Sequence, residues 1–147
     1  MNAHHPHETG LNIGATAART GVSAKMIRHY ESLGLLPPVA RTANGYRVYT
    51  ERDLRALGFI RRARKLGFGM AEIGELVGHW HNERRASAEV KKIAQAHIAE
   101  LEQKMSEMAA MKEALEVLVG QCQGNQNSAC SIIDALAPAE VATPAAR

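Results

Sequence analysis

The sequence predicts a mainly α-helical chain with a winged helix-turn-helix head, one long helix, and a short loop and helix at its C-terminal end. Three observations predict this class. Helix, hairpin and turn signals alternate over the first half of the 147 residues. A run from Ala86 to Val119 contains neither Pro nor Gly, and the chain's two cysteines, Cys122 and Cys130, flank a short polar stretch.

Five segments are expected from these signals. Residues 1–11 and 138–147 are expected to be disordered ends, and the three histidines near the start to be incidental there. Residues 12–78 form the head, which contains a second helix-turn-helix-like pair. Residues 79–119 form a linker and the long helix, and residues 120–137 form the loop and the short helix.

Charge divides the chain unevenly. Residues 1–65 contain eleven Lys/Arg against four Asp/Glu (+7), whereas residues 66–147 contain seven against eleven (−4). A basic head fits phosphate binding, and the acidic remainder argues against the whole chain lying on nucleic acid. No stretch approaches the roughly 18 apolar residues of a membrane span, and no apolar signal core is present, so a cytoplasmic location is expected. The absence of zincin, nucleophile-elbow and phosphate-loop motifs argues against an enzyme.

A helix-turn-helix is expected at the start of the head. Residues 15–20 suit a short helix that Gly21 ends, and Ser23 caps a second helix running to about residue 33. Gly21 permits the turn, and Ile27 packs back between the two helices. The second helix would expose three side chains toward a DNA major groove: Ser23, Lys25 and Arg28.

A two-stranded wing is expected over residues 39–49. Asn44-Gly45 is the preferred two-residue turn, and the aromatic and branched residues after it favour an extended strand. For Tyr49, packing of the wing onto the head and contact with DNA are both open. Three further residues of the wing could bind phosphates beside the groove: Arg41, Tyr46 and Arg47.

A second helix pair is expected after the wing. Thr50 begins Thr-Glu-Arg-Asp, a capping-box-like start, and Gly67 closes this helix before the next one begins near Met70. Four exposed basic residues near the end of the first helix could touch backbone phosphates: Arg61, Arg62, Arg64 and Lys65.

Four motifs within residues 12–78 occur in a familiar order: Thr20-Gly21-Val22-Ser23, Ile27-Arg28-His29-Tyr30-Glu31, Asn44-Gly45-Tyr46-Arg47-Val48-Tyr49 and Ile60-Arg61-Arg62-Ala63-Arg64. This order resembles the MerR family of transcriptional regulators. The resemblance implies a dimeric activator that binds a promoter with an overlong spacer, alongside RNA polymerase, and distorts it when its signal arrives. By position, it also implies DNA contacts by Lys25, Arg28, Tyr30, Tyr46 and Arg47.

The long helix is expected to make a dimer. At about 1.5 Å per residue it would reach roughly 50 Å, more than one small head can cover. Its apolar residues recur at steps of three and four, which makes a seam for a second copy. A two-fold dimer would present two heads to a pseudo-palindromic site. The resemblance adds that the two helices pair antiparallel, as a coiled coil.

Cys122 and Cys130 are expected to hold a metal ion. Thiolates are soft ligands, and in a reducing compartment two cysteines are more often metal-binding or redox-active than a structural disulfide. Zinc sites need three or four protein ligands and iron–sulfur clusters about four cysteines. A monovalent d10 ion accepts two, which favours Cu(I) as effector, with Ag(I) or Au(I) as alternatives. Backbone N–H groups at the start of the short helix could offset the remaining negative charge.

The loop resembles that of the CueR-type copper(I)-responsive regulators within the MerR family, in which two cysteines flank such a loop. Ser87 matches the position where these monovalent sensors carry Ser and zinc-sensing relatives carry a third thiol, which implies a role in ion selectivity. At positions 123 and 131 this chain has Gln and Ser, where copper regulators often carry Pro or other residues. Other hypotheses stay open: a sensor of another thiophilic ion such as Hg(II), a Cys122–Cys130 thiol redox sensor, or a DNA-architectural protein without a ligand.

Overall fold

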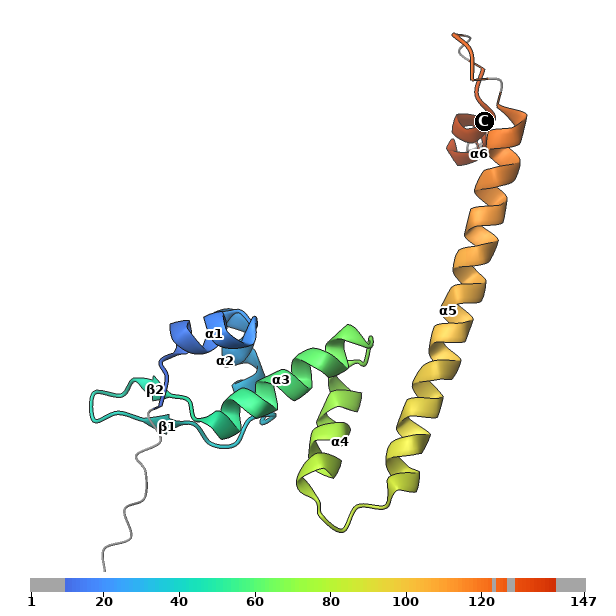
Figure 1. Cartoon of the computed structure of the whole chain (residues 1–147). Helices are drawn as coiled ribbons and strands as arrows, with labels where there is room; N and C mark the ends of the chain where they lie inside the picture. Colours follow the sequence, from blue (N-terminus) through green and yellow to red (C-terminus); the bar gives the residue numbers. More distant parts are fainter. Residues whose placement is uncertain (1–9, 123, 127–128, 140–147) are drawn as a thin grey trace, which may run out of the picture. The chain divides into compact units, whose positions relative to one another are not determined.

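The computed structural model describes residues 10–122, 124–126 and 129–139. The predictions made for the N-terminal histidines, and most of those for the two chain ends, lie outside the described residues. The chain divides into two units, Met1–Ala94 and Gln95–Arg147, which are described separately. Figure 1 shows the order of the helices and strands along the chain.

The first unit begins with the predicted helix-turn-helix. Helix α1 (Ile13–Thr20) starts two residues earlier than expected, because the Asn12 side chain accepts a hydrogen bond of 2.8 Å from the Ala15 N–H and caps the helix. Gly21 ends α1 in the left-handed region, at φ 71°. Helix α2 (Ala24–Ser32) follows the predicted cap, since the Ser23 hydroxyl accepts from the Met26 N–H at 3.2 Å.

The wing is a short antiparallel hairpin of β1 (Ala40–Arg41) and β2 (Arg47–Val48). The predicted two-residue turn is wrong. Thr42 N–H donates to the Tyr46 carbonyl and Gly45 N–H to the Thr42 carbonyl, at 2.8 and 2.9 Å, so three residues form the loop. Only Gly45 of these three has a positive φ (82°), as in a type I turn followed by a left-handed residue, whereas the two-residue type needs two positive φ values.

Helices α3 (Glu51–Lys65) and α4 (Met70–His81) follow the wing in the first unit. The predicted start of α3 is confirmed, because the Thr50 N–H donates to the Asp53 carboxylate at 2.8 Å. The core lies among α1 to α4 and the wing. Its apolar residues exposed by at most 8% are Val22, Ile27, Tyr30, Leu35, Leu36, Tyr49, Ala56, Leu57, Ile60, Ala63, Ile73 and Val77.

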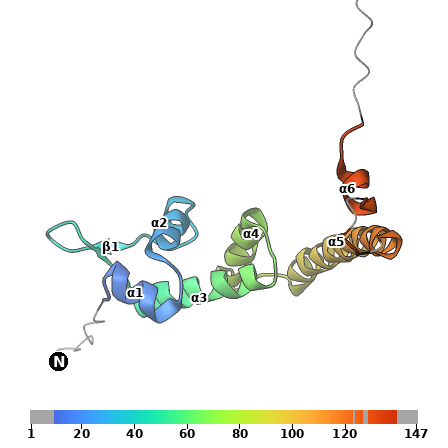
Figure 2. The same ribbon diagram turned by 90° about the horizontal axis from the view of Figure 1, so that it is seen from above.

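The long helix α5 (Ser87–Gln121) and the short helix α6 (Ser131–Leu136) follow. The predicted run without Pro or Gly is helical from Ser87 onward, and α5 continues two residues further because Gly120 and Gln121 still fit its last turn. In Figure 1 and Figure 2, α6 lies beside the C-terminal end of α5. Among the described residues, no helix is long and apolar enough to cross a membrane.

Most apolar residues of the expected α5 seam are exposed in the single chain. The exposed fractions of Ile98, Met105, Met108, Met111 and Leu115 lie between 53% and 69%. Steps of three and four residues place these side chains on one face of the helix. Such a continuous, exposed apolar face on a helix is typical of a surface that a second helix covers.

Candidate metal loop and nucleic-acid interface

The two cysteines lie side by side at the junction of α5 and α6. Cys122 extends the last turn of α5, because its N–H donates to the Leu118 carbonyl at 3.1 Å. Cys130 is the N-cap residue of α6. Their Sγ atoms are 3.8 Å apart, and both residues are half-buried, free thiols.

This separation suits metal binding with little movement. A metal–thiolate bond of about 2.3 Å requires sulfurs roughly 4.6 Å apart on opposite sides of a two-coordinate ion, and closer together at smaller S–metal–S angles. Cys122 and Cys130 at 3.8 Å are therefore within an ångström of such an arrangement. A disulfide, at about 2.05 Å, also lies within reach of side-chain rotation. The donor pair therefore fits a thiophilic ion of low coordination number.

The start of α6 favours a thiolate at Cys130. The backbone N–H groups of Ile133, and then of Ile132, in the first turn of α6 lower the pKa of the Cys130 thiol. The Cys122 thiol lowers the pKa further, while partial burial and the Asp134 carboxylate oppose it. The first turn of α6 therefore lies where its N–H groups could offset negative charge on the Cys130 sulfur, as predicted for the short helix.

Ser131 connects α6 to the end of α5. Its hydroxyl donates to the Leu118 carbonyl at 2.8 Å, the same carbonyl that accepts the Cys122 N–H. Leu118 is within the last four residues of α5, whose carbonyls have no partner inside the helix. One carbonyl thus holds Cys122 itself and the residue next to Cys130. The sequence does not predict this hydrogen bond of Ser131, although a hydroxyl residue directly after Cys130 could have indicated it.

The structure does not bring Ser87 to the cysteines within one chain. Ser87 is the first residue of α5, and Cys122 directly follows its last residue. At about 1.5 Å per residue, the 35 residues of α5 separate the two by roughly 50 Å. Any contact of Ser87 with a cysteine loop must therefore come from a second copy of the chain.

Three of the residues predicted to bind DNA, Arg28, Tyr46 and Arg47, line one hollow between α2 and the wing. Lys25 and Arg28 are on α2, where Arg28 is exposed, and Tyr46, in the wing, is 72% exposed. A hollow of about 370 Å³ is lined by Asn12, Ile13, Arg28, Gly45, Tyr46 and Arg47. Helix α2 and the wing therefore meet at a surface with two arginines, a residue type that suits phosphate binding.

Ser23 and Arg41 have structural partners as well. The Ser23 hydroxyl accepts from the Met26 N–H and caps α2, which leaves its own proton for another acceptor. Arg41 Nη1 donates to the Gly45 carbonyl at 2.8 Å and braces the wing loop. Both residues are exposed.

Tyr30, which the resemblance predicts as a DNA contact, lies on the buried face of α2. Its side chain is only 3% exposed and packs in the core of the first unit. A ring buried to this degree is held by packing, and a DNA contact of Tyr30 stays a prediction. Tyr30 follows Ile27 by three residues, so both lie on the face of α2 that packs on the core, whereas Arg28 lies on the outer face.

Arg47 and Tyr49 share one carboxylate. The Tyr49 hydroxyl donates to Glu31 Oε1, and Arg47 Nε donates to Glu31 Oε2 at 3.0 Å. Tyr49 is fully buried, so the open question about this residue resolves in favour of packing. Burial, followed by the hydrogen bond to Glu31, raises the pKa of Tyr49 well above its ordinary value.

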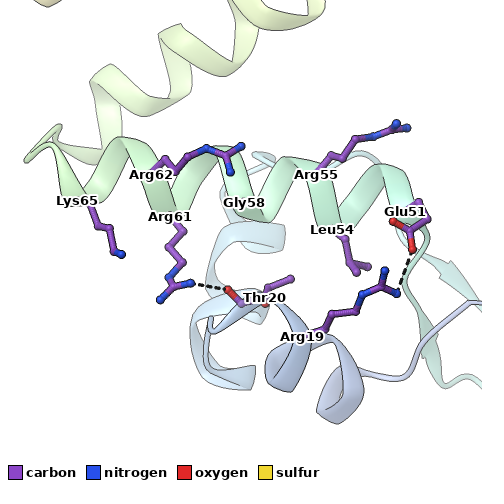
Figure 3. Close-up of a pocket in the computed structure, with 9 residues that line it drawn as sticks. All are labelled: Arg19, Thr20, Glu51, Leu54, Arg55, Gly58, Arg61, Arg62 and Lys65. Carbon is purple, nitrogen blue, oxygen red and sulfur yellow. Dashed lines mark hydrogen bonds and ion pairs between the residues drawn. The ribbon is translucent and has the colours of Figure 1, made fainter.

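A second basic hollow lies between α1 and α3 (Figure 3). It measures about 390 Å³, and its lining residues are Arg19, Thr20, Glu51, Leu54, Arg55, Gly58, Arg61, Arg62 and Lys65. Arg61 donates to the Thr20 carbonyl at 3.2 Å, and Arg19 pairs with Glu51 at 3.1 Å. Two of the cations here therefore link α1 to α3, while Arg62 and Lys65 remain as predicted phosphate contacts.

Known proteins match this chain in sequence and in structure. Residues 11–79 match the family described as MerR HTH family regulatory protein, and residues 54–118 match the one described as MerR, DNA binding. Heavy metal-dependent transcription regulator 2 of Rhizobium meliloti is 45% identical, over 86% of both chains. The HTH-type transcriptional regulator CueR of Salmonella typhimurium is 43% identical, over 86% of this chain and 91% of that protein.

A solved structure of a transcription regulator also resembles this chain. The transcription regulator PbrR691 from Ralstonia metallidurans, in complex with lead(II), aligns with a TM-score of 0.75 and 33% identity. The alignment covers 86% of this chain and 99% of PbrR691. Together with the helix-turn-helix, the wing and the long α5 helix, these matches show that the chain belongs to the MerR family of transcriptional regulators.

Proposed function

We propose that this protein is a metal-responsive transcriptional activator that binds promoter DNA as a homodimer and responds to Cu(I), or to Ag(I) or Au(I), through Cys122 and Cys130. The observation that carries the proposal is the 3.8 Å approach of the two thiols at the α5–α6 junction. The names of the relatives from Rhizobium meliloti and Salmonella typhimurium, and the lead(II) bound to PbrR691, support a heavy-metal signal.

The number of thiols supports a monovalent ion. Two thiolates around a monovalent ion leave one net negative charge, whereas Zn(II) with the same pair would be neutral and short of ligands. The N–H groups of Ile133 and Ile132 at Cys130 reduce the cost of that negative charge. Ser87 supplies no thiol that would complete a site for a divalent ion.

A homodimer explains the exposed face of α5. Ile98, Met105, Met108 and Met111 would be covered by the same face of a second chain. In an antiparallel pair, the N-terminal end of one α5 lies beside the C-terminal end of the other. That arrangement would bring the Ser87 of one chain toward the cysteine loop of the other, which a single chain cannot do.

The metal signal would reach DNA through α6. An ion held by both cysteines fixes the distance between the end of α5 and the first turn of α6, so its binding favours one placement of α6 over others. A changed placement of α6 in the dimer would alter the angle between the two heads. DNA held by both heads, through Lys25, Arg28, Arg41, Tyr46 and Arg47, would then be bent and untwisted until RNA polymerase engages it.

Competition titrations with a chromophoric Cu(I) chelator, under strong reduction, test the site. We expect the wild-type dimer to bind one Cu(I) per chain, and Cys122→Ser and Cys130→Ser to lose this binding. The Ser106→Ala variant, changed at an exposed site on α5, is the control and should bind like the wild type. Equal Cu(I) affinity in the wild type and in both cysteine variants would overturn the assignment of the site to these cysteines. Tighter binding of Hg(II) or Zn(II) than of Cu(I) would overturn the assignment of Cu(I) as the effector.

A redox sensor is the second candidate, because two close thiols and a lowered Cys130 pKa also favour oxidation. Oxidation would join the two sulfurs, release two protons and pass two electrons to an oxidant such as a peroxide. A metal-free sample treated with peroxide distinguishes the two functions. Activation of transcription by peroxide alone would favour the redox sensor, and activation by Cu(I) under strong reduction would exclude it.

A further inference from the structure

Glu31 is the only acidic residue between positions 10 and 50, a stretch with five Lys/Arg. It lies at the end of the recognition helix α2. A carboxylate beside a phosphate-binding surface weakens DNA binding by like-charge repulsion unless a neighbouring cation or hydrogen-bond donor neutralises its charge. The Glu31 side chain is only 17% exposed, and its carboxylate pairs with groups of the protein itself.

The partners of Glu31 come from the wing. One carboxylate oxygen accepts from the Tyr49 hydroxyl, and the other accepts from Arg47 Nε at 3.0 Å. Tyr49 is held in place, because it is fully buried and its backbone pairs with Leu11 through two hydrogen bonds of 2.8 Å. The carboxylate therefore joins α2 to strand β2 at a fixed point.

The bond to Glu31 leaves the Nη groups of Arg47 available to bind a phosphate. A guanidinium has five N–H donors in a rigid plane, and the bond to Glu31 uses the Nε donor. The Nη donors remain for a phosphate, and Arg47 lines the hollow that also contains Arg28 and Tyr46. An arginine held at Nε loses less side-chain freedom on binding than one that is free to rotate.

We propose that Glu31 is a positioning residue for DNA recognition, which orients Arg47 and fixes the wing at one angle to the recognition helix. A wing at a fixed angle can bind the backbone only when α2 is correctly seated in the groove, so Glu31 contributes to the preference for specific DNA over other DNA. The proposal rests on the proposed DNA-binding function of α2 and the wing.

Fluorescence anisotropy with the full-length dimer tests the proposal. The DNA is a duplex selected by the wild-type dimer from random sequence, together with a scrambled duplex of equal length. We compare the wild type with Glu31→Gln, Arg47→Ala and the double variant. Glu31→Gln should lower the ratio of specific to non-specific affinity by about tenfold, within the usual range for coupled charged pairs. In the Arg47→Ala background, the same change should have little further effect.

A matched control separates position from charge. Glu89→Gln removes a carboxylate that pairs with Lys92 on the surface of the same unit, and it should leave the ratio unchanged. Equal rises in both affinities with Glu31→Gln, or the same reduction in the Arg47→Ala background, would overturn the proposal. Should Glu31→Gln fail to fold, Arg47→Lys tests the same point. Lysine keeps the charge but cannot donate to Glu31 and to a phosphate at the same time in the way that the Nε and Nη groups of arginine can. An unchanged ratio of specific to non-specific affinity in Arg47→Lys would overturn the proposal.

The result is distinguishable from failure of the proposed function. A wild-type dimer that does not prefer the selected duplex over the scrambled one would refute sequence-specific DNA binding itself. A wild-type dimer that prefers it, together with an unchanged ratio in Glu31→Gln, would refute only the role of Glu31.

Discussion

The sulfurs of Cys122 and Cys130 lie 3.8 Å apart, and the hydroxyl of Ser131 holds the second cysteine to the helix that carries the first. Because one carbonyl, that of Leu118, accepts from both Cys122 and Ser131, the thiol pair is preorganised by the protein. The metal response, DNA recognition and stability of the protein can each be tested by changes at single residues.

Replacement of either cysteine should separate DNA binding from metal response. Cys122 and Cys130 lie in the second unit, away in sequence from α2 and the wing. Cys122→Ser and Cys130→Ser should therefore bind the selected duplex as the metal-free wild type does, while Cu(I) no longer activates transcription. Gel-shift and transcription assays on the same samples measure both. Failure of the serine variants to bind DNA without metal would contradict this separation.

Removal of the Ser131 hydroxyl should loosen α6. Ser131→Ala deletes the 2.8 Å hydrogen bond to Leu118, and a bond of this kind contributes about 1 kcal/mol. The expected results are faster amide exchange in residues 131–136 and a Cu(I) affinity lower by up to about fivefold, because less of the metal-free protein holds the cysteines together. Ser106→Ala serves again as the control. Unchanged exchange and affinity in Ser131→Ala would show that the hydroxyl does not hold the loop.

Truncation of a core leucine should destabilise the first unit strongly. Leu57 is fully buried, so Leu57→Ala should lower the free energy of unfolding by about 2–5 kcal/mol. Leu66 at the end of α3 is 66% exposed, and Leu66→Ala should cost much less, within about 1 kcal/mol. Urea denaturation followed by circular dichroism measures both. Similar decreases in stability for the two variants would contradict the core described for α3.

The salt dependence of DNA binding should identify the residues that bind phosphate. Arg28→Ala should lower the slope of log affinity against log salt by about one for each phosphate that Arg28 neutralises in the wild type. Arg84→Ala, in the loop between α4 and α5, removes the same charge at a position distant in sequence from α2 and the wing. Its slope should match that of the wild type. Equal changes of slope in both variants would mean that Arg28 acts only through net charge.

The buried Tyr49 should make stability depend on alkaline pH. Its pKa is raised in the folded state, so stability from this group is fully present below its unfolded pKa of 10 and is lost as the pH rises through the higher folded value. Urea midpoints should therefore fall as the pH is raised above 10. Tyr49→Phe should be less stable at pH values below 10 and show a smaller fall. The same fall in both proteins would assign the alkaline effect to other groups.

The sequence was sufficient where a local rule decides the structure. The caps at Ser23 and Thr50, the left-handed turn at Gly21 and the uninterrupted α5 follow from side chains within a few residues. The two-residue turn at Asn44-Gly45 failed because the residues on either side, Thr42 and Tyr46, close the loop by their own hydrogen bond. Short-range turn preferences cannot show which pair of residues closes a loop.

Contacts between residues far apart in the sequence could not be predicted from it. The burial of Tyr30 and the sharing of Glu31 by Arg47 and Tyr49 depend on how α2 packs against the wing. The bond from Ser131 to Leu118 joins residues thirteen positions apart across the cysteine loop. Cys122 and Cys130 were predicted as a pair from their spacing and softness, but their separation and the N–H groups at Cys130 became visible only in three dimensions.

A reconstituted transcription assay, on a promoter recovered by the wild-type protein from genomic fragments, tests the metal response most directly. Purified RNA polymerase and the dimer are incubated under strong reduction with Cu(I), Ag(I), Zn(II) or Hg(II), and transcript is measured for the wild type and for the Cys122→Ser/Cys130→Ser double variant. Activation by Cu(I) and Ag(I) is expected in the wild type alone. Full activation of the double variant by Cu(I), or activation of the wild type by Zn(II) but not by Cu(I), would contradict this expectation.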